Sequence, residues 1–349
     1  MTQATRVAII GATGYSGIEL VRLLQSHPQV QLTYLSSESY TGQAISEVYP
    51  HLAGRIGHAL DGLDPAAVAA RADVVFLGLP AGKSSELVPA FLAAGLRVID
   101  MGGDFRLVDG AVHEQWYKKP APPRHVQAEA VYGLSELWRD AVRQARFITN
   151  PGCYATSAIL GLAPLLRHGL IDPASVIIDA KSGVSGAGRG VTLGVHFAEV
   201  NENFQAYKVN QHQHTPEIEQ VLGQVAAQPL TVTFTTHLLP ITRGILCTSY
   251  ATLKAPVTAE ALRTLYTGDY AGCPFVRTMP LGSFPATKQV QGSNYCDIGL
   301  AVDERTHRVT VISVIDNLVK GAAGQAIQNF NLMMGYGEGV GLDVSPLYP

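Results

Sequence analysis

The sequence predicts an α/β protein in which a doubly wound parallel sheet is followed by an α+β domain with a largely antiparallel sheet. The first hundred residues alternate short β-branched runs with segments of helical spacing, a rhythm typical of βαβ units. From about residue 230 onward, long β-branched runs are separated by turns. The chain has 349 residues, more than the roughly 250–300 that one core usually serves. We therefore expect two domains.

The expected strands of the first domain alternate with helices that have an apolar face. Leu20, Leu23 and Leu24 fall on one side of the first helix. The run ADVVFLGL is apolar throughout, as expected of a strand buried on both faces. The expected strands are 6–10, 30–35, 72–79, 96–101 and 145–148, with helices at 17–26 and 87–94. Residues 108–145, with a proline-rich patch, are expected to form an irregular covering loop and connector.

The second domain is expected to contain strands at 230–241, 245–254 and 309–315. We place it at 153–317, and we expect its exposed sheet to be a subunit interface. The first domain is then 1–152, completed by the C-terminal segment 318–349. That segment includes an apolar helix at 318–334, which we expect to pack back on the first domain.

Composition excludes several classes of protein. Hydrophobic residues make up 47% of the chain, charged residues 15%, and the formal net charge is -3. This balance suits a large core and offers no basic surface for nucleic acid. No stretch approaches the roughly 18 uncharged apolar residues of a membrane helix, and no signal-peptide pattern opens the chain. We therefore expect a cytoplasmic protein that binds neither nucleic acid nor a membrane.

The cysteines lie at positions 153, 247, 273 and 296 and form no C-x-x-C pair. This spacing argues against a zinc cluster and against a disulfide framework. In a reducing compartment they are thiols. For most of them the expected role is that of a small buried hydrophobic residue.

The motif GATGYSG at 11–17 joins the first strand to the first helix. Glycines let the backbone turn tightly and approach a pyrophosphate, whose charge is met by the helix N-terminus. Glycines also mark ordinary turns, but the position between a strand and a helix at the start of a βαβ unit favours dinucleotide binding. The motif therefore predicts a Rossmann-type domain. The expected cofactor contacts come from Gly11, Thr13, Gly14, Tyr15, Ser16 and Gly17.

The end of the second strand bears on the choice of dinucleotide. Sites that prefer NAD usually place an acidic residue there, about 20 residues after the glycine motif. This chain has Ser36 and Ser37 at that position, and two hydroxyls suit a 2′-phosphate. Glu38 follows them and would oppose this preference. We expect NADP, bound in part by Ser36 and Ser37.

The segment NPGCYATS at 150–157 lies between an apolar strand and a helical pattern, which places Cys153 at a helix N-terminus. The backbone N–H groups and the helix dipole there stabilise a thiolate and lower the pKa of a thiol. The same N–H groups can hold a developing oxyanion. The alternative is a helix-capping turn that happens to contain a cysteine.

A nucleophilic thiol needs a neighbouring acid or base, and the segment HQHTPEIE at 212–219 is the best candidate. Pro216 favours a helix start, which places His214 at its beginning. Glu217 lies three residues on and is able to reach back toward the imidazole. Two alternatives stay open: surface polar residues, or half of a metal site. The metal reading lacks a third ligand at a recognisable spacing, and we expect no metal.

With these motifs in hand, the chain resembles the N-acetyl-gamma-glutamyl-phosphate reductases of arginine biosynthesis, within the aspartate-semialdehyde dehydrogenase superfamily. The resemblance rests on GATGYSG, NPGCYATSA, HQHTPEIEQ, HLLPITRGIL and IDNLVKGAAG, and it runs from residue 6 to the final segment. It implies an α/β fold with a Rossmann-type domain and an α+β catalytic and oligomerisation domain. It also implies a homodimer or homotetramer.

The resemblance implies a role for individual residues. Cys153 would be the nucleophile, His214 the acid and base, and Glu217 the group that orients the histidine. Substrate binding would fall to Arg106, Asn150, His212 and Arg243. The nicotinamide end of the cofactor would meet Ser182, Gly183, Ser185, Gly186 and Asn317, with Ser185 and Arg189 as anion-binding candidates.

The implied reaction is the NADPH-dependent reduction of N-acetyl-L-glutamyl 5-phosphate to the 5-semialdehyde through a cysteine thioester, with release of inorganic phosphate. Aminoadipyl phosphate or aspartyl phosphate is an alternative substrate, since one methylene is worth only about 1–3 kcal/mol of discrimination. A non-catalytic NADP sensor is an alternative of a different class. The separate cysteine and histidine motifs argue against a sensor, which needs neither.

Overall fold

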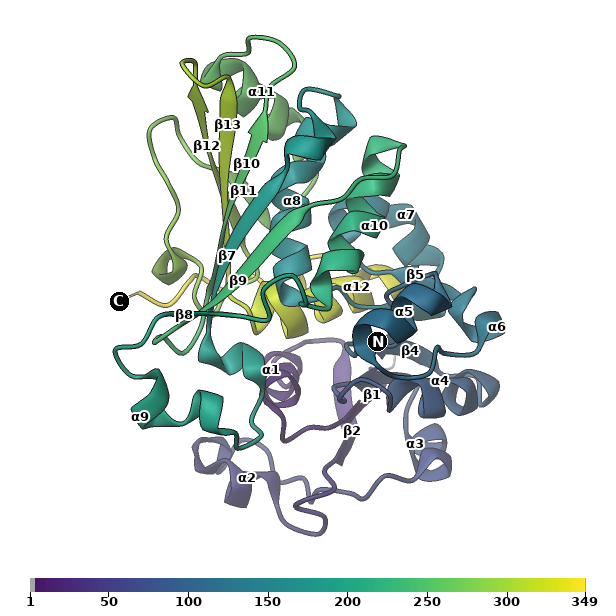
Figure 1. The fold of residues 1–349 in the computed structure, drawn as a ribbon. Helices are drawn as coiled ribbons and strands as arrows, with labels where there is room; N and C mark the ends of the chain where they lie inside the picture. The colour runs from purple at the N-terminus through teal and green to yellow at the C-terminus, as the bar shows by residue number, and fades with distance from the viewer. Residues whose placement is uncertain (1–3, 349) are drawn as a thin grey trace. The chain divides into compact units, whose positions relative to one another are not determined.

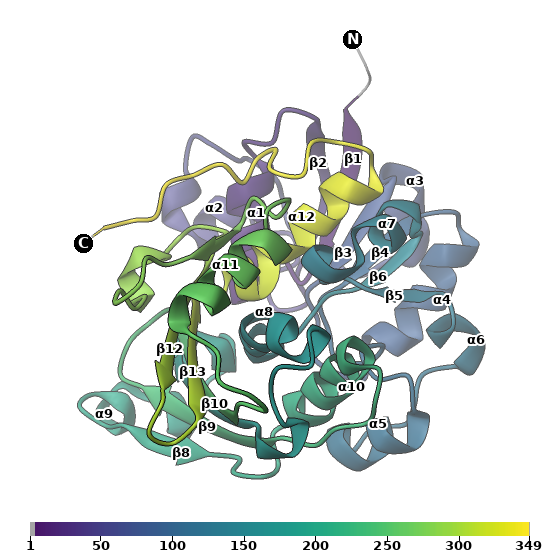
Figure 2. The same cartoon turned by 90° about the horizontal axis from the view of Figure 1, so that it is seen from above.

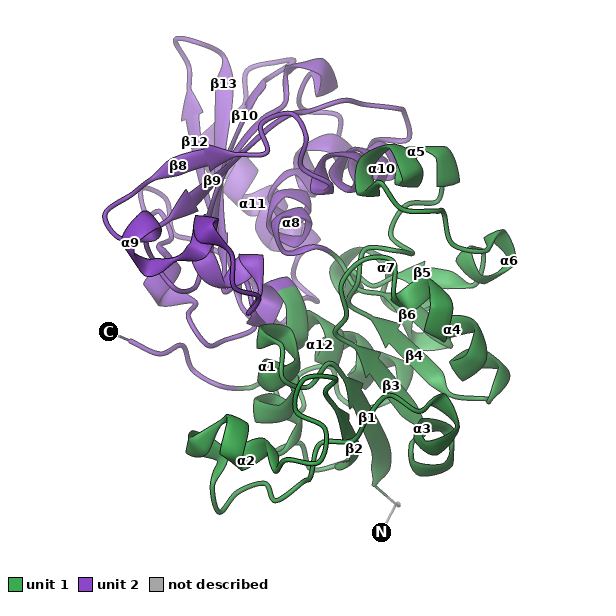
Figure 3. Cartoon of the chain, turned by 60° about the horizontal axis from the view of Figure 1, so that its bottom comes forward, with its two compact units in different colours: residues 1–151, 322–343 green, residues 152–321, 344–349 purple. Residues whose placement is uncertain are grey.

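The computed structural model describes residues 4–348, drawn as a ribbon in Figure 1. Within this described part, the chain divides into two compact units (Figure 3). Unit 1 consists of the described residues up to Pro151 together with 322–343. Unit 2 consists of 152–321 and the described residues from Val344 on.

Unit 1 is built on a parallel sheet with the strand order β2-β1-β3-β4-β6-β5. The strands are β1 (Thr5–Ile10), β2 (Val30–Ser36), β3 (Val74–Leu77), β4 (Arg97–Asp100), β5 (Ala130–Tyr132) and β6 (Phe147–Thr149). Strand β1 pairs with β2 on one side and with β3 on the other, so the strand order reverses there. Open α/β sheets bind ligands beyond the carboxyl ends of the strands at such a point. The residues after β1 are therefore placed where a ligand is expected.

The helices and turns of unit 1 are α1 (Tyr15–Leu24), α2 (Ile45–Val48), the 3-10 turn η1 (Pro50–Leu52), α3 (Pro65–Arg71), α4 (Ser84–Ala93), α5 (Gly110–Tyr117), α6 (Arg124–Gln127), α7 (Ser135–Gln144) and α12 (Gly324–Met333). Helices α1, α3, α4 and α7 contact strands of this sheet. The core includes Phe105 and Phe147, whose rings meet edge to face with centroids 4.9 Å apart. The C-terminal helix α12 belongs to this unit, where Nε2 of His27 and Oδ1 of Asn331 lie 2.9 Å apart.

The expectation of an irregular segment at 108–145 was wrong, since this stretch contains α5, α6, β5 and α7. Helices α5 and α6 and strand β5 are short, so their side-chain periodicity is weak. Helix α5 begins where the Asp109 carboxylate accepts the N–H groups of Ala111 and Val112. Strand β5 has only half-buried side chains and exists because it pairs with β6. A side-chain cap and strand pairing, rather than an apolar pattern, therefore hold α5 and β5.

Unit 2 contains a mixed sheet with the strand order β11-β12-β13-β10-β7-β9-β8. Its strands are β7 (Ile177–Gly183), β8 (Gln205–Tyr207), β9 (Thr233–Leu239), β10 (Ile245–Thr252), β11 (Val276–Thr278), β12 (Cys296–Asp303) and β13 (Arg308–Ile315). The pairs β7–β9 and β11–β12 are parallel, and the other pairs are antiparallel. The sheet is thus largely antiparallel, as predicted.

One face of this sheet packs on helices (Figures 1 and 2). The helices and turns of the unit are α8 (Cys153–Arg167), η2 (Pro173–Ser175), η3 (Val184–Ala187), η4 (Leu193–Val195), α9 (Phe197–Val200), α10 (His214–Ala226), α11 (Ala259–Asp269) and η5 (Thr287–Gln289). Helix α8 is buried along almost all its length, lies on β10 and β13, and packs on α10. In β10, buried and half-exposed side chains alternate strictly.

The expected helix at 318–334 is divided into two parts. Residues Val319–Ala323 form a π-helical turn, and α12 follows it directly. The chain passes from unit 2 to unit 1 between Gly321 and Ala322, inside that turn. Single π-helical turns frequently occur at functional sites. Here the turn brings Gly321 beside Cys153, because a side chain at residue 321 would place its Cβ 2.8 Å from Cys153 Cβ.

Candidate active site

The loop between β1 and α1 has the shape of an anion cradle. A Cβ at Gly17 would lie 2.1 Å from the carbonyl oxygen of Gly11, so α1 approaches the loop this closely only with glycine there. Helix α1 begins after Gly14 without a side-chain cap and has no acidic residue in its first turn, where Tyr15 and Ser16 are half-buried. N–H groups at such a helix start favour a phosphate. The residues present fit a dinucleotide.

Hydroxyl groups at the end of β2 join this loop. Ser36 Oγ accepts the N–H of Gly11 at 3.3 Å, and the hydroxyls of Thr13 and Ser37 lie 2.8 Å apart. Both serines are buried, whereas Glu38 is exposed to solvent. The fold thus brings the predicted cofactor residues of the glycine loop and of the second strand together.

Cys153 is the first residue of α8, and its side chain is half-exposed. Gly152 precedes it as an N-cap with no side-chain hydrogen bond, and the first turn contains no acidic residue. The helix dipole therefore acts on the thiol without a competing carboxylate in that turn. Cys247 offers a contrast in the same unit, since burial raises the pKa of its thiol to about 12.

His214 is the first residue of α10 and is buried. Its ring lies against the start of α8, because a Cβ at Gly152 would fall 2.3 Å from Nε2 of His214. Only glycine at residue 152 leaves room for the imidazole at this point. The predicted nucleophile and the predicted acid and base are thus carried by two helix N-termini that pack on each other.

Glu217 lies in the first turn of α10 and is completely buried. Its Oε1 accepts the backbone N–H of Gly152 at 2.8 Å. The carboxylate therefore ties the residue before the nucleophile to the helix that carries His214. This contact with the backbone was not part of the sequence prediction, which considered Glu217 only as a partner of the imidazole.

The predicted substrate residues Arg106 and Asn150 are placed together in unit 1. Nε of Arg106 donates to the carbonyl oxygen of Asn150, and its other guanidinium nitrogen Nη2 donates to Met101 O, both at 2.9 Å. The Asn150 amide donates to Ala322 O at 3.2 Å and accepts from Asn329 at 3.0 Å. Asn150 directly follows β6, and Arg106 lies in the segment between β4 and α5. His212, in unit 2, is buried beside His214.

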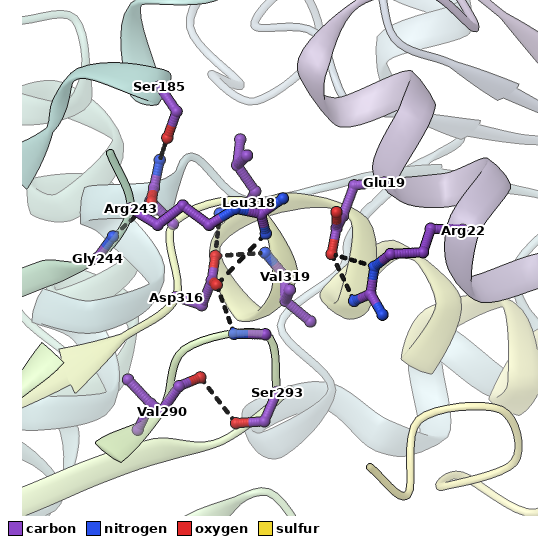
Figure 4. A network of polar contacts seen from close by, with 12 residues as sticks. Glu19, Arg22, Ser185, Arg243, Gly244, Val290, Ser293, Asp316, Leu318 and Val319 are labelled. Atoms are coloured by element: carbon purple, nitrogen blue, oxygen red, sulfur yellow. Dashed lines mark hydrogen bonds and ion pairs between the residues drawn. The ribbon is translucent and has the colours of Figure 1, made fainter. Parts of the chain in front are cut away.

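A second group of predicted residues meets around the turn after β13 in unit 2 (Figure 4). Asn317 Oδ1 accepts the N–H of Gly244 at 2.7 Å, and its Nδ2 donates to Ser185 Oγ at 2.9 Å. Gly186 lies close by, since a Cβ there would be 3.2 Å from Ser182 Oγ. Ser182, in turn, donates its hydroxyl to the carbonyl of Gly183 at 3.0 Å. Arg189, three residues after Gly186, is half-buried.

Asp316 organises this turn and was missed in the sequence. Its carboxylate is fully buried and accepts the N–H groups of Gly292, Leu318 and Val319 at 2.7, 2.8 and 3.2 Å. Arg243 Nη1 lies 3.5 Å from Oδ2 of the same carboxylate. The detectable signal was an aspartate two residues before a helical start, a common side-chain cap.

The fold and the site define a two-domain α/β dehydrogenase with a cysteine at a helix N-terminus. Family models agree: residues 6–145 match the semialdehyde dehydrogenase NAD binding domain, and residues 153–317 match the semialdehyde dehydrogenase dimerisation domain. The solved structure of aspartate semialdehyde dehydrogenase II from Vibrio cholerae, complexed with ASA, has a TM-score of 0.73 at 18% identity. It is matched over 96% of this chain and 99% of its own. This likeness shows the fold.

Curated relatives are much more similar in sequence. An N-acetyl-gamma-glutamyl-phosphate reductase of Symbiobacterium thermophilum is 58% identical over 99% of each chain. One from Geobacillus kaustophilus is 57% identical over 98% of this chain and 99% of its own. This chain belongs to the N-acetyl-gamma-glutamyl-phosphate reductase family. The predicted family, enzyme class and fold class are confirmed.

Among the helices of residues 4–348, none has both the length and the hydropathy that a bilayer span needs. The same residues contain no group of three or more His, Cys, Asp or Glu side chains arranged to hold a metal ion.

Proposed function

We propose that this chain catalyses the NADPH-dependent reduction of N-acetyl-L-glutamyl 5-phosphate to N-acetyl-L-glutamate 5-semialdehyde in arginine biosynthesis. The observation that carries the proposal is the approach of His214 Nε2 to Gly152, at the start of the helix that Cys153 opens. A thiol beside an imidazole at a helix N-terminus is suited to acyl transfer. The names of the curated relatives supply the substrate.

In the first half-reaction, the Cys153 thiolate attacks the carbonyl carbon of the acyl phosphate. A C–S bond forms, the bond between that carbon and the phosphate oxygen breaks, and inorganic phosphate leaves with the electron pair. The N–H groups in the first turn of α8 face the oxyanion that develops. Gly152 contributes none of these, since its N–H is bound by Glu217.

The second half-reaction needs a hydride at the thioester carbon, which NADPH held by the β1–α1 loop would supply. His214, protonated, stabilises the resulting oxyanion and donates a proton to it. The imidazole then takes that proton back as the thiohemiacetal collapses, the C–S bond breaks, and the aldehyde leaves with Cys153 again a thiolate. Glu217 orients the two helix starts during these steps through its bond to Gly152.

The assignment of the cofactor residues rests on the fit between the β1–α1 loop and a dinucleotide. Gly11, Gly14 and Gly17, with Thr13, Tyr15 and Ser16, would hold the pyrophosphate, and Ser36 and Ser37 the 2′-phosphate. We assign Ser182, Gly183, Ser185, Gly186 and Asn317 to the nicotinamide end. Substrate carboxylate and phosphate groups would be met by the guanidinium groups of Arg106 and Arg243, which suit such anions, and by the side-chain amide of Asn150.

For the domains, we propose that the first, expected at 1–152 with 318–349, binds NADP and that the second, expected at 153–317, carries catalysis and oligomerisation. Gly152, residues 318–321 and the described residues from Val344 on belong to unit 2 instead of unit 1. The half-exposed face of the unit 2 sheet, with Leu246, Thr248 and Tyr250 on β10, would contact a second copy in a homodimer or homotetramer. The name of the family model for 153–317 supports this assignment. Thr248→Arg should lower the mass measured by light scattering. An unchanged mass would place the interface elsewhere.

A cytoplasmic location is part of the proposal. The structure holds the cysteines as thiols rather than disulfides, as suits a reducing compartment. The inorganic phosphate and acyl phosphate would be small-molecule partners.

The decisive test runs the reaction backwards, with purified protein, NADP, phosphate and N-acetylglutamate semialdehyde, while NADPH is recorded. Aspartate semialdehyde, the aminoadipate analogue and a phosphate-free sample run in parallel. Phosphate-dependent reduction of NADP with the acetylglutamate aldehyde is the expected result. Preference for another aldehyde would retain the chemistry and replace the substrate. Absence of turnover with every aldehyde, in protein that binds NADP, would refute the proposal.

A further inference from the structure

We propose that His212 is a positioning residue for His214, which it holds by capping the first turn of helix α10 through Nδ1. This replaces the substrate contact that the family resemblance implies for His212. The proposal rests on the proposed function, in which His214 is the acid and base.

The cap is visible in the hydrogen bonds at the start of α10. Nδ1 of His212 accepts the backbone N–H of His214 at 3.1 Å, and the carbonyl oxygen of His212 accepts the N–H of Thr215 at 2.9 Å. The next residue, Pro216, has no N–H. Gln213 occupies the N-cap position but makes no side-chain cap bond. His212 therefore satisfies the two leading N–H groups of the helix, which otherwise lack partners within it.

The His212 ring is held rigidly by aromatic neighbours from three other segments. Tyr154 lies 5.3 Å away at 89°, Tyr207 5.7 Å away at 77°, and Phe234 5.6 Å away at 86°. His214 itself lies 4.6 Å away at 66°. The His212 side chain is only 5% exposed. Such a ring presents little surface to a substrate, whereas its edge-to-face contacts fix the direction of Nδ1.

The protonation state agrees with this role. Burial above all, together with the nearby His214 and Lys208, lowers the pKa of His212 to about 2. The ring is thus neutral, with Nδ1 as acceptor and the proton on Nε2. Tyr154 and Tyr207, the other titratable groups against the ring, also stay neutral because burial raises the pKa of both hydroxyls. Because His212 is neutral, His214 is the residue of the pair that carries the positive charge.

The cap bears on catalysis because the N–H group that it binds belongs to His214, the proposed acid and base. The backbone of His214 is the first of α10, and its Nε2 lies against Gly152. Loss of the Nδ1 acceptor would let the helix start fray and the imidazole swing away from Cys153. Misplacement of a catalytic group by about 1 Å can cost on the order of a hundredfold in rate.

The test compares His212→Asn, His212→Gln and His212→Phe in the full-length protein. Asparagine places an amide oxygen near the position of Nδ1, glutamine places its amide near Nε2, and phenylalanine keeps a ring with no nitrogen. We expect His212→Phe and His212→Gln to lower kcat by roughly ten- to a hundredfold with little change in substrate KM. His212→Asn should recover most of kcat. Tyr207→Phe, which keeps the ring against His212, is the matched control and should remain near wild type.

A second readout needs no turnover. The rate of alkylation of Cys153 by iodoacetamide, measured as a function of pH, follows the fraction of thiolate. Labelling that is lost in Cys153→Ala is the labelling of this residue. A displaced His214 should move the profile of His212→Phe to higher pH, since a protonated imidazole stabilises the thiolate. His212→Asn should return it toward wild type. Thermal melting shows which variants are folded, and the Asn and Gln pair decides the matter if His212→Phe is not.

Recovery by His212→Gln instead, with a raised KM in His212→Asn, would show that Nε2 binds substrate and would overturn the proposal. A wild-type alkylation profile and kcat in His212→Phe would do the same. If wild-type protein turned over no aldehyde, the proposed function would fail. The alkylation profiles would still test whether His212 positions His214 beside the thiol.

Discussion

The buried carboxylate of Glu217 and the backbone N–H of Gly152 are joined by a hydrogen bond of 2.8 Å. Gly152 immediately precedes the nucleophile, and Glu217 lies in the helix that His214 opens. This bond therefore fixes the start of the helix that carries Cys153 against the helix that carries His214. Glu217 also lies in the first turn of α10 after His214, where a carboxylate favours the protonated form of the imidazole.

Substitution of Glu217 should separate these two effects. Glu217→Ala leaves the Gly152 N–H buried without an acceptor, so the free energy of unfolding should fall by about 1–3 kcal/mol and kcat with it. Glu217→Gln retains an acceptor oxygen and should be nearly as stable as wild type. Urea denaturation and kcat would be measured for both. If the Glu217→Gln protein is stable and still loses kcat, the charge acts on His214. Equal stability of the Ala variant would show that the bond contributes nothing.

Gly152→Ala should displace the imidazole. The new Cβ would lie 2.3 Å from His214 Nε2, so the ring must move away from Cys153. We expect a loss of kcat on the order of a hundredfold, with iodoacetamide alkylation of Cys153 still measurable. Gly268→Ala in α11, where an added Cβ would meet no atom within 4 Å, is the control. A fully active Gly152→Ala enzyme would contradict the assignment of His214 as the acid and base.

An acidic residue at the end of β2 should weaken the binding of NADPH more than that of NADH. Ser37→Asp would set a negative charge beside Thr13, where the 2′-phosphate of NADP is proposed to lie. We expect the Kd for NADPH to rise at least about tenfold while that for NADH rises less. Fluorescence titration measures both, with Ser37→Ala as the uncharged control. An equal loss of affinity for NADPH and for NADH would indicate damage to the fold instead of a charge effect.

Asp100 should make the protein less stable as the pH rises. Its carboxyl is fully buried at the end of β4, where Oδ1 accepts the Ser84 hydroxyl and the Gly102 N–H. Burial raises the pKa of Asp100 to about 6. The folded state therefore keeps a proton that the unfolded chain has already lost, and this stabilisation is lost as the pH rises through about 6.

Between pH 5 and pH 8, this single group should account for a decrease of about 1.4 kcal/mol in the free energy of unfolding. Asp100→Asn retains an acceptor oxygen and removes the titration. Urea unfolding at the two pH values would show a smaller decrease for the variant than for wild type. Identical decreases in both proteins would rule out titration of Asp100 in this range.

Several elements could be predicted because their signal is local. The glycine loop requires a strand before it and a helix after it, and GATGYSG stands between two such patterns. Cys153 lies where an apolar strand ends and a helix begins, so its place at a helix N-terminus followed from neighbours a few residues away. By contrast, α5 and β5 carry little periodicity, and their formation depends on the Asp109 cap and on pairing with β6. Sequence reasoning missed them for that reason.

Motifs alone therefore specified the kind of chemistry: a thiol activated at a helix start, an imidazole at another, and a glycine cradle for a dinucleotide. Backbone geometry over a few residues is enough for each of these. Tertiary packing decided which atoms of these groups are in contact. Gly152 and Glu217 are 65 residues apart, and His212 turns its Nδ1 to the chain rather than to solvent because aromatic rings from distant segments enclose it. Such contacts depend on how α8 and α10 pack together, and spacing along one helix contains no information about its neighbour.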